Sequence, residues 1–62
     1  MTKEQFENNK QLYLGANVNT AIRMMKLNGQ GYVNELASFL RPLPNLPNTV
    51  ENVATRMCTG VY

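Results

Sequence analysis

The chain has 62 residues, a length that limits it to one domain. A chain of this size buries roughly 60% of the surface exposed by its unfolded form, so small folds usually add a disulfide, a metal or a partner chain. Cys58 is the single cysteine and histidine is absent, which excludes an internal disulfide and the imidazole ligands of zinc. We therefore expect the chain to associate with another copy of itself or with another protein.

The charge is weakly basic and shows no concentrated nucleic-acid-binding surface. Six Lys and Arg residues stand against four Glu residues, giving a net charge of +2, and the basic residues are scattered. DNA-binding proteins commonly neutralise several phosphates with a clustered basic face. The segment 2–11 is too polar for a signal peptide or a membrane span, and an unpaired cysteine suits a reducing compartment. We expect a cytoplasmic protein without a membrane segment.

The first helix is expected to begin after Thr2, because a Thr followed three residues later by Gln forms a capping-box pattern. Gly15 then leaves two alternatives, since a glycine inside a helix costs about 1 kcal/mol relative to alanine. Either one long helix covers about 2–27, or the first helix ends near Leu14 and Asn17 caps a second one. The apolar side chains keep one helical register across the glycine, which favours the long, bent helix.

The middle of the chain contains a helix between two breaks. The segment Asn28-Gly29-Gln30-Gly31 forms a strong stop, because Asn and Gly can adopt the left-handed conformation that closes a helix. The next helix is expected over about 32–40 and ends before Pro42, since the residue preceding a proline is pushed out of helical geometry. The segment 42–47 is predicted to be extended and polyproline-like, with its two leucines packed on the core.

The last helix is expected over about 49–59. Asn48 followed by Glu51 repeats the pattern of a cap and an acidic residue, and a carboxylate near a helix N-terminus suits the helix dipole. Gly60 is the expected closing residue. The chain as a whole is therefore predicted to be all-α, one domain over 1–62, folded as a small oligomeric bundle of three or four short helices.

Three stretches share an apolar spacing of i, i+3, i+4 and i+7, which aligns side chains along one side of a helix. Such stripes usually form a core, but in a chain this small the core of an oligomer is also its interface. We therefore predict that association takes place through these positions: Val18, Ile22, Met25, Val33, Leu36, Leu40, Val50, Val53 and Met57.

No set of residues in the sequence is suited to catalysis. Nucleophilic catalysis needs a base beside the nucleophile, and without histidine Cys58 has no such partner, so a structural thiol is expected. The glutamates are isolated or lie in a polar, lysine-flanked first turn. Gly29 and Gly31 lack the preceding strand and the following Lys-Ser/Thr of a phosphate-binding loop. We expect a non-enzymatic protein with no cofactor and no metal.

One alternative gives the chain a nucleic-acid function. A helix, a glycine-containing turn and the helix over 32–41 have the order of a helix-turn-helix motif. Because Asn and Arg side chains can contact base edges, the DNA contacts would be Asn34, Ser38 and Arg41. The placement of Glu35 among the phosphates and the absence of a basic flank disfavour this alternative.

The opening residues Met1–Lys10 (MTKEQFENNK), the segment Pro42–Pro47 (PLPNLP) and the size and composition of the chain resemble the short early proteins of lambdoid bacteriophages, encoded between the exonuclease and excisionase genes. The resemblance spans the whole chain without a diagnostic motif, and no binding residues follow from it. It implies a helical, non-enzymatic accessory factor in the host cytoplasm, which influences the host cell cycle or the choice between lysis and lysogeny. The favoured prediction is thus a regulator that binds a host or phage protein.

Overall fold

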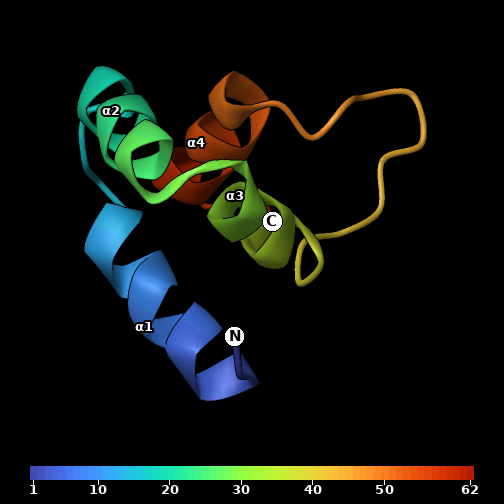
Figure 1. Cartoon of the computed structure of the whole chain (residues 1–62), viewed down its shortest axis with the longest axis horizontal. Coiled ribbons are helices and arrows are strands. Elements are labelled where there is room, and N and C mark those ends of the chain that lie inside the picture. Colours follow the sequence, from blue (N-terminus) through green and yellow to red (C-terminus); the bar gives the residue numbers. More distant parts are fainter.

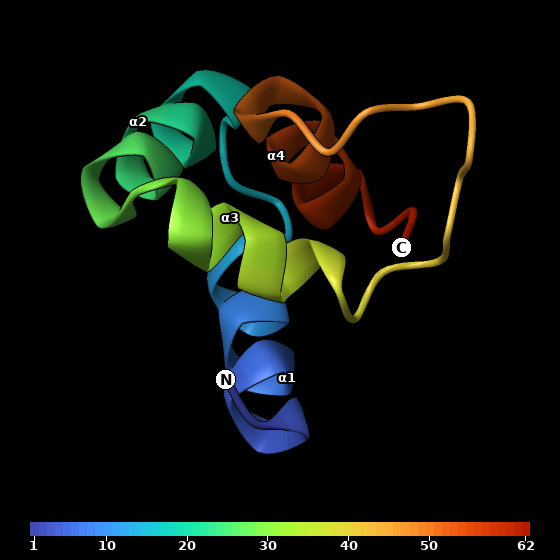
Figure 2. The same cartoon turned by 45° about the vertical axis from the view of Figure 1, so that its right-hand side comes forward.

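The computed structural model describes residues 1–62 and contains four α-helices and no strand (Figure 1). The helices are α1 (Lys3–Tyr13), α2 (Val18–Asn28), α3 (Gln30–Ala37) and α4 (Val50–Thr59). Helices α2, α3 and α4 pack together, and α1 extends beyond them on one side (Figures 1 and 2). The prediction of an all-α fold is confirmed.

The chain breaks between α1 and α2, so the favoured long helix is wrong and the alternative with two helices is correct. Gly15 has a φ of 82°, in the left-handed region that glycine adopts without strain. Its backbone N–H donates to the carbonyl of Cys58 on α4 at 3.3 Å. The Asn17 side chain then caps α2 by accepting from the backbone N–H of Asn19. The turn directs α2 back across α4, and the two helices pack together. A continuous helix would have carried the apolar face of 18–28 away from α4.

Side-chain caps begin both α1 and α4. The Thr2 hydroxyl accepts from the backbone N–H of Gln5, and the Gln5 side chain accepts from the Thr2 N–H, which confirms the predicted capping box. At α4 the cap is Thr49, whose hydroxyl accepts from the N–H of Asn52 at 3.1 Å. The predicted cap, Asn48, is therefore one position too early.

Helix α3 begins and ends earlier than the expected range 32–40. Only Gly29 separates it from α2, and its φ of 94° places the bend at the predicted stop. After Ala37 the chain continues in turns, in which the N–H groups of Phe39 and Leu40 donate to carbonyls three residues earlier. These turns still bring Leu40 into the core, with 5% of its surface exposed.

The segment 41–49 forms a loop that leaves the helices before returning to α4 (Figures 1 and 2). It is not extended throughout, because the Leu46 N–H donates to the Leu43 carbonyl at 2.9 Å and closes a turn over Pro44 and Asn45. Proline presets the backbone angle of the first central position of such a turn, and Asn is tolerated at the second. Leu43 is half-buried and Leu46 is 48% exposed. The prediction that both leucines pack on the core is wrong for Leu46.

The core is a single cluster of buried side chains to which all four helices contribute. Its members are Phe6, Tyr13, Ala21, Met25, Val33, Leu36, Leu40, Val53, Ala54, Met57 and Cys58. Six of the nine predicted interface positions belong to it, namely Met25, Val33, Leu36, Leu40, Val53 and Met57. The other three, Val18, Ile22 and Val50, are partly buried at its margin. The stripes thus close on one another within one chain, and the prediction that association takes place through them stays a prediction.

Candidate functional site

The residues proposed to contact DNA are exposed, but they do not form a basic helix face. On α3 the Asn34 side chain accepts from Gln30 Nε2 at 3.0 Å, and the Ser38 hydroxyl donates to the Glu35 carbonyl at 2.6 Å. Helix α3 contains no Lys or Arg, and Arg41 lies beyond its end in the loop. The helix that would enter the major groove therefore provides no cation for the phosphates.

The thiol of Cys58 lies in the core, with 9% of the residue's surface exposed. Burial raises the pKa of this thiol, so the neutral form is favoured over the nucleophilic thiolate. No group of three or more His, Cys, Asp or Glu side chains lies together that could hold a metal ion. None of the four helices combines the length and the apolar character needed to cross a bilayer.

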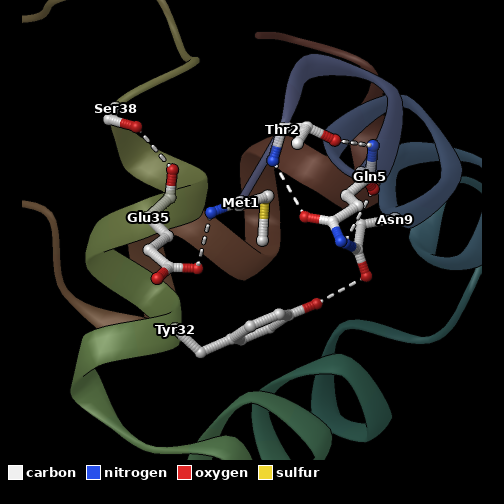
Figure 3. Close-up of polar contacts among 7 residues, drawn as sticks. All are labelled: Met1, Thr2, Gln5, Asn9, Tyr32, Glu35 and Ser38. Atoms are coloured by element: carbon white, nitrogen blue, oxygen red, sulfur yellow. Dashed lines mark hydrogen bonds and ion pairs between the residues drawn. The ribbon is translucent and has the colours of Figure 1, made fainter.

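A polar seam joins α1 to α3 (Figure 3). The Tyr32 hydroxyl donates to Asn9 Oδ1 at 2.7 Å and lies 3.3 Å from the Tyr13 hydroxyl, while the Met1 ammonium lies 3.6 Å from a Glu35 carboxylate oxygen. Burial, followed by the hydrogen bond with Tyr13, raises the pKa of Tyr32. The Tyr32 phenol therefore remains neutral and links α1 to α3. The polar groups of the seam are already bound to one another.

Two neighbouring hollows lie where the loop 41–49 passes the C-terminal segment. One, of about 550 Å³, is lined by residues within 37–48. The other, of about 380 Å³, is lined by Arg41, Leu43, Arg56, Gly60, Val61 and Tyr62. Because Arg41 and Leu43 line both, we treat the hollows as one feature, the loop–tail groove. Figure 2 shows the C-terminal segment on the side of α4 that faces this loop.

Four hydrogen bonds fix the walls of the groove. Gly60 ends α4 in the left-handed conformation, as expected, and the Val61 N–H donates to the Arg56 carbonyl at 3.2 Å. The Arg41 N–H donates to the Tyr62 backbone oxygen at 3.0 Å. The Arg56 guanidinium donates from Nη2 to the Arg41 carbonyl at 2.7 Å and from Nε to the Val61 carbonyl at 3.4 Å. The start of the loop, the end of α4 and the tail are thereby held together.

The two arginines of the groove have no acidic partner. Arg56 is only 7% exposed, and the ion pairs of the chain, counted to 4.0 Å, are Met1 with Glu35 and Lys10 with Glu7. A buried charge is costly unless it is paired or hydrogen-bonded, and Arg56 is balanced here by two carbonyl oxygens alone. The groove therefore combines a buried cation with an exposed one, and no Asp or Glu side chain lines it.

Apolar side chains lie at the margin of the groove. Val61 is 64% exposed and Leu46 is 48% exposed. Leu14, at the end of α1, is 45% exposed, and its Cδ1 lies 3.5 Å from the position of a Cβ on Gly60. Lys10 reaches the same corner, with its Nζ 4.3 Å from the centre of the Tyr62 ring. The groove is thus bordered by exposed apolar side chains as well as by cations.

The sequence alone did not identify this groove. Its residues come from three separate segments, 37–48, Arg56 and 60–62, and no local spacing connects them. Arg56 lies on the last predicted helix but outside its apolar stripe, so its position predicts neither burial nor contact with the loop. The one part of the groove that stands out in the sequence is the proline-rich segment 42–47, but its two leucines were predicted to pack on the core.

Comparison with protein-family models, with curated proteins and with solved structures finds no significant match to this chain.

Proposed function

We propose that this chain is a small non-enzymatic regulator that acts by binding another protein through the loop–tail groove. The observation that carries the proposal is that two arginines without an acidic partner line the same groove as the exposed side chains of Leu46 and Val61. Arginine and aromatic residues are enriched at protein interfaces, and prolines reduce the entropy lost when a loop is ordered by binding. A second copy of the chain is a weaker candidate partner, because the apolar stripes are already covered within one chain.

The resemblance to short early proteins of lambdoid phages gives the proposal a biological setting. The partner would be a host or phage protein in the cytoplasm of the infected cell, and the process would be the host cell cycle or the choice between lysis and lysogeny. The DNA-binding alternative lacks a comparable observation, since α3 carries no basic residue.

Affinity capture with matched surface variants tests the proposal. A tagged chain is expected to retain one protein from a lysate of infected cells, and a Leu46→Ser, Val61→Ser double variant is expected to lose it. Leu27→Ser is the matched control, because Leu27 is 88% exposed and does not line the groove. Retention of the same protein by the double variant would refute the proposal. A gel shift of duplex DNA that is abolished by Asn34→Ala would favour the DNA-binding alternative.

A further inference from the structure

We infer that the loop–tail groove recognises a carboxylate, from an Asp or Glu side chain flanked by apolar residues in an extended segment of the partner. This inference rests on the proposed function and names the chemistry of the segment that the groove binds. Arg56 would provide a fixed guanidinium at the base of the groove, and Arg41 a second, exposed one at its wall.

The guanidinium of Arg56 has donors left over after its contacts within the chain. Nε and Nη2 each donate to a backbone carbonyl, whereas Nη1 makes no hydrogen bond. Asn52 Oδ1 is the only buried side-chain nitrogen or oxygen atom that has no hydrogen-bond partner. Because Nη1 also has no partner but is not such an atom, it is accessible to solvent. Arg56 is one of the residues that line the hollow, and Nη1 is the donor group that its contacts within the chain leave free. The planar fork of an arginine matches the two oxygens of a carboxylate, and the two fixed carbonyl contacts already set its orientation.

The surroundings of Arg56 favour an anion. Arg41 lines the same hollow and is exposed, and Lys10 lies over the ring of Tyr62 at the same corner. No Asp or Glu side chain lines either hollow, and Glu7 is paired with Lys10 at 3.1 Å. A hollow lined by charges of one sign and by apolar walls concentrates the opposite charge from solution.

The apolar walls distinguish a peptide from a nucleic acid. A nucleic-acid backbone presents phosphates at regular intervals and requires a row of cations along its path. Here the arginines are followed along the loop by Leu43, Leu46 and the prolines, and Val61 stands on the opposite side. Such neighbours suit a segment in which apolar side chains flank a single carboxylate.

Arg56 also has a structural role, because its two hydrogen bonds join the loop to the tail. Substitution of Arg56 would therefore confuse loss of binding with loss of the groove. Arg41 is exposed and its side chain makes no hydrogen bond within the chain, so Arg41→Gln removes a cation while the walls remain. Arg23→Gln is the matched control, since Arg23 is an exposed arginine on α2 that does not line the groove.

The test is an NMR titration of the full chain with acetyl-Leu-Asp-Leu-amide and, separately, with acetyl-Leu-Asn-Leu-amide. The acidic peptide is expected to shift the backbone signals of Arg41 and Val61 and the side-chain Nε–H signal of Arg56. The neutral peptide should need an about tenfold higher concentration for the same shift, as expected when a charge-assisted hydrogen bond is lost. Arg41→Gln should weaken binding of the acidic peptide severalfold, and Arg23→Gln should leave it unchanged.

Equal shifts with both peptides, or shifts confined to residues outside the groove, would overturn the inference. Sodium acetate that binds as tightly as the acidic peptide would show an adventitious anion site only, and would overturn recognition of a peptide. A duplex oligonucleotide that shifts the Arg56 Nε–H at lower concentration than the peptide would overturn it in favour of nucleic acid. If capture of the protein partner depends on Val61 but not on Arg41, the proposed function stands and the carboxylate inference fails. If capture does not depend on the groove at all, the proposed function itself fails.

Discussion

Truncation of Leu36 tests whether the core of a single chain is the source of stability. Leu36 is fully buried on α3, in the cluster shared by all four helices. Replacement of a buried leucine by alanine costs about 2–5 kcal/mol. At about 0.05–0.15 kcal/mol per residue, a chain of 62 residues has a total stability of roughly 3–9 kcal/mol. Leu36→Ala should therefore remove about a fifth or more of the free energy of unfolding.

Urea unfolding followed by far-UV circular dichroism measures this loss. Leu27→Ala is the control, because Leu27 is 88% exposed and surface substitutions usually change stability by less than about 0.5 kcal/mol. The loss for Leu36→Ala should also be the same at low and high protein concentration, since the stripe is buried within one chain. Equal midpoints for the two variants would refute the assigned core. A loss that shrinks as concentration rises would instead show that Leu36 lies in an interface between chains.

Three further predictions follow from individual side chains. Burial and the raised pKa of the Cys58 thiol should make its alkylation by iodoacetamide far slower in the folded chain than in urea; equal rates would contradict its burial. The pKa of Tyr32 is raised above its ordinary value of 10.0, so the stabilisation from the neutral phenol should be complete below about pH 10 and be lost progressively above it. Urea midpoints measured against pH should fall less steeply for Tyr32→Phe than for the parent chain. Asn52 Oδ1 is buried without a partner, so Asn52→Ala should leave the melting temperature unchanged or raise it, and a large decrease would indicate a missed contact.

Features that depend on neighbours along the chain were predictable from the sequence. The Thr2 capping box, the stop at Gly29 and the closing Gly60 were each predicted correctly, because caps and left-handed positions involve residues only a few places apart. The apolar stripes were found for the same reason, since helical periodicity is a local property. The structure shows six of the nine stripe positions buried in one chain.

Features that depend on contacts between distant segments were not predictable. The register of apolar residues across Gly15 favoured one long helix, but the contact of this turn with Cys58, 43 positions further along the chain, accompanies two helices instead. Leu46 was expected inside, yet the turn over 43–46 leaves it half exposed.

The sequence by itself determined the helical class, the start of α1, the end of α2, the ends of α4 to within a residue and the identity of the apolar faces, since each of these is set by residues within a few positions of one another. Only the tertiary structure decided which faces meet, and it placed Arg56, Arg41 and the tail around one groove. Arg56 is buried there while its guanidinium donates to carbonyl acceptors on two other segments, the loop and the tail. That arrangement requires the completed packing of α4 against the loop and the tail, and no pattern along the chain encodes it.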